Sequence, residues 1–162
     1  MMADENRPIY SFDTSALIDG IERFYPLANF PALWDRIDSL IAEGRLRVSE
    51  EAWKEALAAD MPLKEWCTAE GSDRERCVYP TDSGVATVAG AIVAQFPKWA
   101  GQGKKNSADP FVVAVGEVND FMVVSGETNG GPGNPKIPYV CGQRSVRHGR
   151  FVDVVVLEGW VF

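Results

Sequence analysis

Four acidic residues stand at positions where their side chains could act together. Asp13 and Glu127 each come shortly after an apolar run with the character of a strand. Asp109 opens an apolar segment with helical periodicity, and Glu55 lies about one turn into another helical segment. Two carboxylates about 4 Å apart repel by roughly 4 kcal/mol at an effective dielectric constant of about 20. Convergence of these side chains would therefore require a counter-ion or a large upward shift of pKa.

A hard divalent cation is the economical counter-ion for such a cluster. Carboxylate oxygens suit Mg²⁺ or Mn²⁺, whereas Zn²⁺ favours nitrogen and sulfur ligands that these positions lack. Each acid also has an ordinary structural role open to it. Asp13 suits the N-cap of a helix, Asp109 before Pro110 suits a helix start, and Glu55 and Glu127 suit solvated surface.

The elements that must position these residues are predicted from hydrophobic periodicity and from turn signals. Strands are expected at 9–12, 46–48, 77–79, 121–124 and 151–156, and helices at 14–23, 31–43, 50–59, 62–70, 83–96 and 110–118. The segments 97–107 and 129–135, rich in Gly, are expected to be exposed loops. Alternating strands and helices indicate an α/β sandwich with a mainly parallel sheet covered by helices on both faces. In such sheets the site lies beyond the carboxyl ends of the strands, where the acids are expected.

Length and composition favour one globular domain. The chain has 162 residues, 46% hydrophobic and 24% charged, and no run approaches a membrane span. We expect a single domain over residues 8–162, with residues 1–7 as a short N-terminal extension that is not a secretory signal. Three unevenly spaced cysteines favour a reducing, cytoplasmic setting. The net charge of −7 argues against a uniformly nucleic-acid-binding surface but leaves room for a local basic groove.

Basic side chains near the acids are candidates for contact with a phosphodiester. Lys104 and Lys105 must lie beside Asp109, and Lys136 lies between them and the basic C-terminal segment. Such side chains could hold a nucleic-acid backbone, although solvated surface explains them equally well. Trp99 lies in the segment expected to be an exposed loop, so it is our candidate among the tryptophans for stacking on a base.

Four segments resemble, in order, the motifs of PIN domains. Segment 12–18, Phe-Asp-Thr-Ser-Ala-Leu-Ile, resembles the opening motif D-T/S-S/N after an apolar strand. Segment 48–57 resembles the second, an acid on the helix after strand two, and segment 107–114, Ser-Ala-Asp-Pro-Phe-Val-Val-Ala, resembles D-x-x-I-A-A. Segment 123–127, Val-Val-Ser-Gly-Glu, resembles an apolar strand followed by S/T-x-D, with Glu in place of Asp. The Ala-Asp-Pro-Phe form, with Asn-Pro-Lys-Ile-Pro at 134–138, resembles a little-characterised, toxin-like PIN subgroup.

The resemblance implies a three-layer PIN-like fold and a metal-dependent endoribonuclease. Its metal, Mg²⁺ or Mn²⁺, would be held by the residues that match the family's acids, which are Asp13, Glu55, Asp109 and Glu127. Thr14, Ser15 or Ser125 would assist through hydrogen bonds to a ligand carboxylate or a water, or would contact substrate. The implied partners are an RNA substrate and a cognate antitoxin, and PIN toxins are often homodimers.

Two alternatives stay open. A PIN-like module without catalysis could bind RNA or a protein partner, which the Glu127 replacement and the acidic net charge favour. A structure-specific DNA nuclease would share the chemistry but usually carries more acids. A nucleotide-binding P-loop is absent, His148 and the three cysteines lack zinc-site spacing, and a phosphatase of the haloacid dehalogenase type would need an acid where Ser15 stands.

Overall fold

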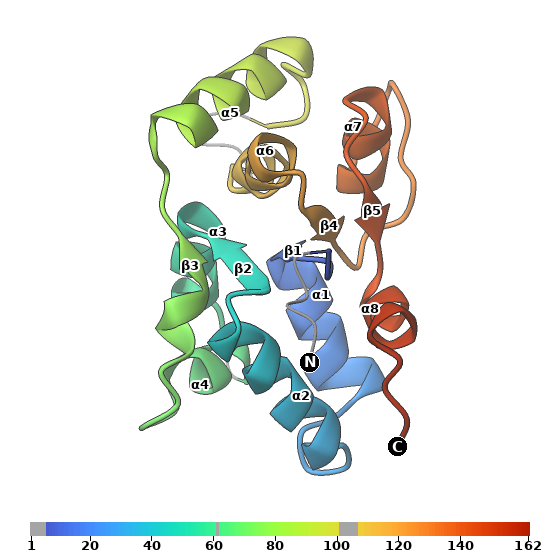
Figure 1. The fold of residues 1–162 in the computed structure, drawn as a ribbon. Coiled ribbons are helices and arrows are strands. Elements are labelled where there is room, and N and C mark those ends of the chain that lie inside the picture. The colour runs from blue at the N-terminus through green and yellow to red at the C-terminus, as the bar shows by residue number, and fades with distance from the viewer. Residues whose placement is uncertain (1–5, 61, 101–106) are drawn as a thin grey trace.

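The fold is built around a five-stranded sheet in which every strand is parallel to its neighbours. It is seen in a computed structural model that describes residues 6–60, 62–100 and 107–162. The strand order is β3-β2-β1-β4-β5 (Figure 1). The strands are β1 (Tyr10–Phe12), β2 (Leu46–Ser49), β3 (Val78–Tyr79), β4 (Met122–Val124) and β5 (His148–Gly149).

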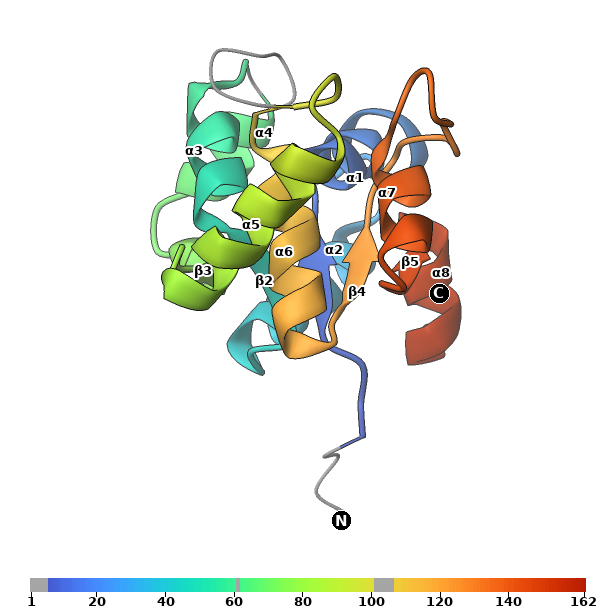
Figure 2. The ribbon, with the colours of Figure 1, turned by 90° about the horizontal axis from the view of Figure 1, so that it is seen from above.

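Helices cover both faces of the sheet and complete three layers. Figures 1 and 2 show α5 and α6 over one face, with α1, α2 and α8 on the other. The helices are α1 (Thr14–Asp19), which continues as the π-helix η1 (Gly20–Phe24), α2 (Pro31–Ala42), α3 (Glu50–Ala58), α4 (Leu63–Thr68), the 3₁₀-helix η2 (Arg74–Cys77), α5 (Ser83–Gln95), α6 (Asp109–Asn119), α7 (Ile137–Gln143) and α8 (Phe151–Glu158). The predicted α/β class, with a parallel central sheet flanked by helices, is confirmed.

The core lies on both sides of the central strands. All residues of β1 and β4 are buried, as expected for a parallel sheet that is covered on both faces. Phe12 of β1 packs edge-on against Phe151 of α8, and α6 contributes a run of buried valines to the opposite face. Within the described ranges, no helix has both the length and the apolar character that crossing a membrane requires.

The prediction of a strand at 151–156 is wrong, because this segment forms α8. The run Val-Asp-Val-Val-Val has the β-branched composition of a strand. The helix is instead set by its start, where the Asp153 carboxylate accepts a hydrogen bond from the Arg150 backbone N–H at 2.7 Å. Phe151 and Val154, three residues apart, provide its buried side. The last strand of the sheet is β5, which pairs with β4 just before this helix.

The prediction of an exposed loop at 97–107 fails at Trp99 and Ala100, which are buried, while residues 101–106 lie outside the described residues. Trp99 is only 4% exposed and packs near Phe96, with 6.3 Å between ring centroids, so it is not placed to stack on a base. A short helix, α7, was not predicted, since Pro138 follows its first residue and the stretch before it is rich in Gly and Pro. Proline is compatible with the first turn of a helix, where backbone N–H groups have no helical partner.

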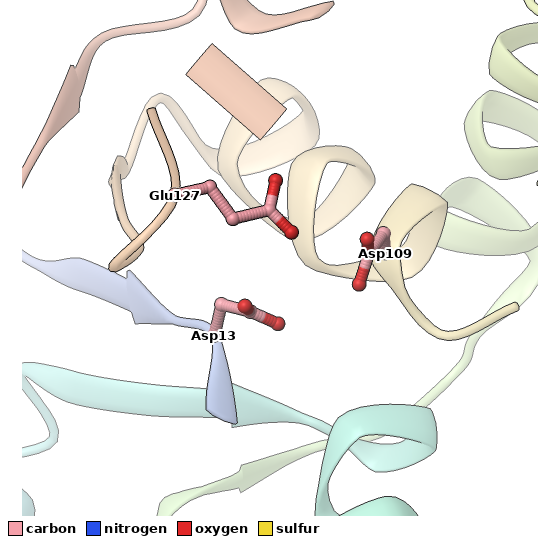
Figure 3. Close-up of side chains that lie close together, drawn as sticks. All are labelled: Asp13, Asp109 and Glu127. Carbon is pink, nitrogen blue, oxygen red and sulfur yellow. The ribbon is translucent and has the colours of Figure 1, made fainter. Parts of the chain in front are cut away.

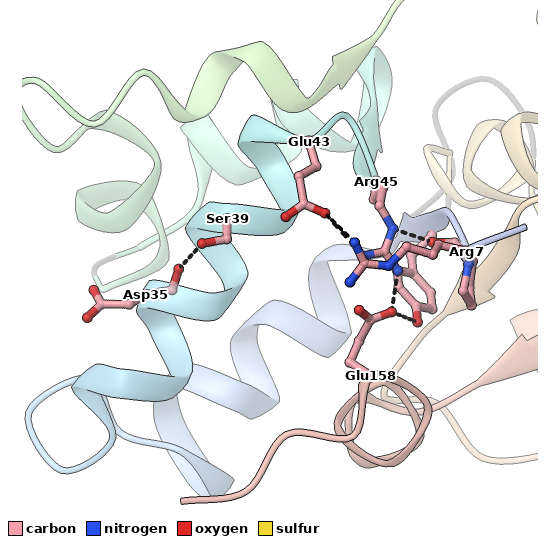
Figure 4. A network of polar contacts seen from close by, with 8 residues as sticks. Arg7, Asp35, Ser39, Glu43, Arg45 and Glu158 are labelled. Carbon is pink, nitrogen blue, oxygen red and sulfur yellow. Dashed lines mark hydrogen bonds and ion pairs between the residues drawn. The ribbon is translucent and has the colours of Figure 1, made fainter. Parts of the chain in front are cut away.

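A buried ion pair joins α8 to the central strands. Arg45, next to β2, forms an ion pair with Glu158, and both side chains are at most 9% exposed (Figure 4). The Tyr10 hydroxyl donates to the same carboxylate at 2.6 Å, and Arg45 Nε donates to the Pro8 carbonyl at 3.0 Å. Glu43 binds the same guanidinium from a side chain that is 43% exposed, with 3.3 Å between Oε1 and Nη1.

Loss of one partner from this pair should be costly, because an uncompensated charge would stay buried. We expect Glu158→Ala to lower the free energy of unfolding by about 3 kcal/mol. The matched control, Glu43→Ala, removes an exposed partner of the same Arg45 and should cost less than about 1 kcal/mol. Urea unfolding followed by circular dichroism measures both, and equal losses for the two variants would contradict the prediction.

Candidate metal centre

Three carboxylates from distant parts of the chain meet at the carboxyl ends of the central strands. Asp13 directly follows β1, Asp109 is the first residue of α6, and Glu127 lies on the loop after β4. One oxygen from each lies within 4.8 Å of the others, and Figure 3 shows the three side chains pointing toward one another. The parallel sheet brings β1 and β4 side by side, with Phe12 paired to Val124, so residues that follow these strands share one edge.

Asp13 divides its two oxygens between structure and site. Oδ2 caps α1, accepting from the Ser15 backbone N–H at 3.2 Å and from the Ser15 hydroxyl at 2.5 Å. Oδ1 is buried and has no hydrogen-bond partner among the described residues. A buried acceptor without a donor is costly unless something else satisfies it, and a cation among the three carboxylates would do so. The N-cap role considered from the sequence is therefore real, and it leaves the second oxygen available.

The electrostatics of the cluster disfavour three bare negative charges. Burial raises the pKa of Asp109 to about 9, and the neighbouring Asp13, Glu127 and Glu55 add to this shift. Burial also raises the pKa of Asp13 to about 6, against the opposing hydrogen bond from the Ser15 side chain. Without a counter-ion, carboxylates in such a cluster hold protons in place of charge. The donor set consists of oxygen atoms alone, which fits Mg²⁺ or Mn²⁺.

Glu127 is oriented from two sides. Its Oε2 accepts a hydrogen bond from the Ile137 backbone N–H at the start of α7, at 2.8 Å. Its own backbone N–H donates to the Ser125 hydroxyl at 3.4 Å. The extra methylene relative to Asp lets the carboxylate reach both α7 and the cluster. Helix α7, which the sequence did not predict, is thus the element that holds the carboxylate of Glu127.

Glu55 lies beside this group of three and is not a member of it. The residue as a whole is exposed, while partial desolvation of its carboxylate raises its pKa. The Thr14 hydroxyl donates to Glu55 Oε1 at 3.4 Å, and hydrogen bonding to Thr14 and to the Ala108 backbone opposes the upward shift of pKa. The charge of Glu55 nevertheless raises the pKa of both Asp13 and Asp109, so it lies close to the site.

The other predicted site residues occupy different positions around the cluster. Ser15 links two of its parts, because its hydroxyl donates to Asp13 and accepts from the Gly126 backbone N–H at 2.9 Å. Ser125 is fully buried behind Glu127. Lys136 is partly buried, and its charge lowers the pKa of Asp109. Lys104 and Lys105 lie outside the described residues.

His148 is a neighbour of the site that sequence reasoning set aside. Its Nε2 lies 2.7 Å from the Ser125 hydroxyl oxygen, and burial lowers its pKa. The contact follows from the pairing of β4 with β5, in which Val123 is opposite His148. The spacing of Ser125 and His148 in the sequence does not predict their contact. The contact depends on the pairing of β4 with β5, which a last strand at 151–156 does not include.

The Ser15 hydroxyl is expected to matter for metal affinity without being a ligand. Ser15→Ala removes one hydrogen bond to Asp13 and one to the loop that carries Glu127. Loss of such an orienting contact typically weakens metal binding about 10- to 100-fold. Calorimetric titration with Mn²⁺ measures the effect. The control is Ser39→Ala, an exposed serine whose hydroxyl binds the Asp35 carbonyl (Figure 4), and equal affinities for the two variants would contradict the prediction.

Comparisons with known proteins place this architecture. A family model described as "Domain of unknown function (DUF4411)" matches residues 10–162. The structure is similar to the crystal structure of FitAcB from Neisseria gonorrhoeae, with a TM-score of 0.52 and 16% sequence identity over 86% of this chain and 95% of that chain. At this identity the likeness concerns the fold, and it agrees with the PIN-like sandwich expected from the sequence. No curated protein matches the chain.

Proposed function

This chain belongs to the DUF4411 family, and we propose that it is a divalent-metal-dependent endoribonuclease. The observation that carries the proposal is the group of three carboxylates, in which the buried Oδ1 of Asp13 has no hydrogen-bond partner within the part of the chain that the structure describes. The group lies at the sheet edge where open α/β folds bind their ligands. Its side chains come from the positions that resemble the acidic motifs of PIN domains.

Each acid would have a distinct part in this site. Asp13 Oδ1 and a carboxylate oxygen of Asp109 would hold the ion, since both side chains are buried and have high pKa values without one. Glu127, fixed by the Ile137 N–H, would complete the site or orient the attacking water. Glu55, beside Thr14, would act from the edge of the site, directly or through a water. A divalent ion supplies neutralisation of charge on the scissile phosphate and activation of a water at neutral pH.

Substrate contact is proposed for the basic and hydroxyl side chains around the acids. Lys136 lies near enough to Asp109 to lower its pKa, so its ammonium group is placed to meet a phosphate that approaches the site. Lys104 and Lys105 precede Asp109 closely in the chain and are proposed for the same task. Such contacts would offset the repulsion between an RNA backbone and a protein of net charge −7.

We test the activity with a mixed pool of structured RNAs. Wild type and Asp13→Asn, purified identically, are incubated with Mn²⁺, with Mg²⁺ and with EDTA. The proposal expects cleavage that requires a metal and that the variant lacks. If the folded wild type binds RNA but cuts none of the pool, a non-catalytic RNA-binding module replaces the nuclease. Cleavage that persists in EDTA would also overturn the proposal.

The resemblance to toxin-like PIN proteins further supports an inhibitory protein partner. An unrestrained ribonuclease is hazardous to the cell that makes it, so a cognate antitoxin that covers the acidic site is proposed. Expression of the chain alone should arrest bacterial growth, and co-expression of a neighbouring open reading frame should relieve the arrest. Normal growth on expression of active enzyme would contradict this part of the proposal.

A further inference from the structure

A cavity separate from the group of three carboxylates opens beside the loop that carries Glu127. It has a volume of about 490 Å³ and lies between η1 and the start of α8. Its wall includes Ser125, Gly126 and Thr128, the residues around Glu127 in the chain. The cavity therefore shares the loop of Glu127 with the candidate metal centre, while the three carboxylates themselves lie outside its lining.

Two arginines give this cavity a chemistry suited to a polyanion. Arg23 of η1 and Arg150 before α8 both line it, and the acid in its lining, Asp19, is paired with Arg23. The Arg23 side chain is 73% exposed and makes a loose ion pair with Asp19, with 3.7 Å between Nη1 and Oδ1. Guanidinium groups bind phosphate oxygens in a forked geometry. Because the Arg23 side chain is largely exposed and its contact with Asp19 is long, the guanidinium is free to turn toward a phosphate.

Aromatic rings form the apolar part of the same wall. Tyr25 is fixed in place, because its ring packs on Phe151 with 5.1 Å between centroids and its carbonyl accepts from Trp34 Nε1 at 2.6 Å. Phe24 is 58% exposed, and its ring lies next to that of Tyr25, with 6.3 Å between centroids. Exposed rings beside arginines are typical of sites that stack bases of single-stranded nucleic acid.

The π-helix accounts for the position of these side chains. A π turn inserts one extra residue into a helix, and such turns often occur at functional sites. Here it occupies Gly20–Phe24, directly after α1. Gly20 allows η1 to approach α8, since a Cβ at this position would lie 2.7 Å from the Phe151 ring. Arg23 and Phe24 belong to this π turn, and both line the cavity.

A smaller cavity of about 260 Å³ continues past Thr128 and Arg150, which line both cavities. Its other walls are formed by two acids, Glu127 and Asp153, and by Asn129, Pro138, His148 and Gly149. The two cavities thus lie one after the other along the loop that carries Glu127, as a path for an extended chain would. A protein partner would need apolar surface, which α8 also offers at Val152 and Val156, but the paired arginines and the place beside the acids favour a nucleotide.

We propose that the larger cavity binds one nucleotide of a single-stranded RNA, with its base against Phe24 and its phosphates between Arg23 and Arg150. This assignment rests on the proposed ribonuclease function and adds to it a preference for unpaired RNA. Bases in a duplex are stacked on each other and cannot reach an aromatic ring in a cavity. The nucleotide lies next to the scissile phosphate, so the cavity selects which part of a folded RNA enters the site.

Binding is measured without cleavage, so that the result does not depend on catalysis. The probe is a fluorescein-labelled single-stranded RNA decamer, followed by anisotropy in EDTA and in Ca²⁺, beside the same decamer in a duplex. The double variant Arg23→Ala/Phe24→Ala should weaken single-strand binding tenfold or more. Wild type should bind the single strand at least fivefold more tightly than the duplex.

The matched control is Arg147→Ala/Phe162→Ala. It removes an exposed arginine with a similar ion pair to Asp120, and a phenylalanine that is 59% exposed, both away from the cavity. This control should bind within twofold of wild type.

Single-strand binding by the cavity variant within twofold of wild type, or a preference for the duplex, would overturn the assignment. Unchanged RNA binding with loss of a dimer in sedimentation would assign the surface to a protein contact instead. RNA binding that depends on the cavity, in a protein without cleavage, would refute only the nuclease.

Discussion

The Asp109→Asn variant is expected to lose RNA cleavage, with kcat/KM lowered at least about a thousandfold. The substitution keeps the shape of the side chain at the first position of α6 but removes its negative charge. A metal contributes several kcal/mol to stabilisation of the charged transition state, which corresponds to a loss of this size when its site is broken. Cleavage of a labelled RNA under single-turnover conditions with Mn²⁺ measures the loss.

The same helix supplies a control for this experiment. Asp120 caps the other end of α6, is exposed, and has a backbone φ of 57°, a conformation that asparagine adopts readily. Asp120→Asn therefore removes the same charge without strain and should retain full activity. Full activity of both variants would show that Asp109 does not serve catalysis, and an equal loss in both would point to a general effect of charge.

The second large effect concerns the stability of the metal-free protein, which Asp109→Asn should raise although it removes activity. We expect the metal-free protein to lose stability as pH rises from about 4 to about 9. The pKa of Asp109 rises from 3.8 to about 9 on folding, and that of Asp13 rises to about 6. At a pH between 3.8 and its folded-state pKa, each of these carboxyl groups loses its proton in the unfolded chain and keeps it in the folded protein. Rising pH therefore favours unfolding over this range. Below pH 4 both states hold the protons, and this contribution to stability is fully present.

Asp109→Asn removes this pH dependence in part. The variant should exceed metal-free wild type in unfolding free energy by about 2 kcal/mol or more at pH 9, and the difference should shrink towards pH 5. Urea unfolding at pH 5, 7 and 9 in EDTA measures the difference, with Asp120→Asn as the reference. Addition of Mn²⁺ at pH 7 should stabilise wild type and leave Asp109→Asn nearly unchanged. Parallel pH profiles for wild type and variant would contradict the electrostatic interpretation of the cluster.

Much of the fold follows from periodicity along the chain. The central strands β1, β2 and β4 are short and mostly apolar, and segments with helical character separate them, so the alternation that defines a parallel α/β sheet is visible in the sequence. The segment of α8 is different, because its valines indicate a strand while its start, fixed by Asp153 and the Arg150 N–H, favours a helix. Local propensity is a weak guide where a cap and a buried face three residues apart act against it.

The site was predictable to a similar extent. Asp13 and Glu127 come together because each follows one of two neighbouring parallel strands, and Asp109 joins them because it begins the helix that covers these strands. The positions of the three acids in the sequence imply this arrangement. What holds them was not predictable. The Ile137 N–H on Glu127 depends on α7, and the contact of His148 with Ser125 depends on the register of β5. These contacts are non-local, and no spacing within the chain encodes them.

Anomalous scattering from crystals grown with Mn²⁺ tests most directly whether the three carboxylates form a metal site. The expected result is a manganese peak enclosed by Asp13, Asp109 and Glu127, in contact with Oδ1 of Asp13, the oxygen without a hydrogen-bond partner in the described ranges. The same crystals of Asp109→Asn should show that peak weakened or absent. A wild-type structure with Mn²⁺ in the crystal, well-ordered carboxylates and no peak between them would contradict the proposed metal centre.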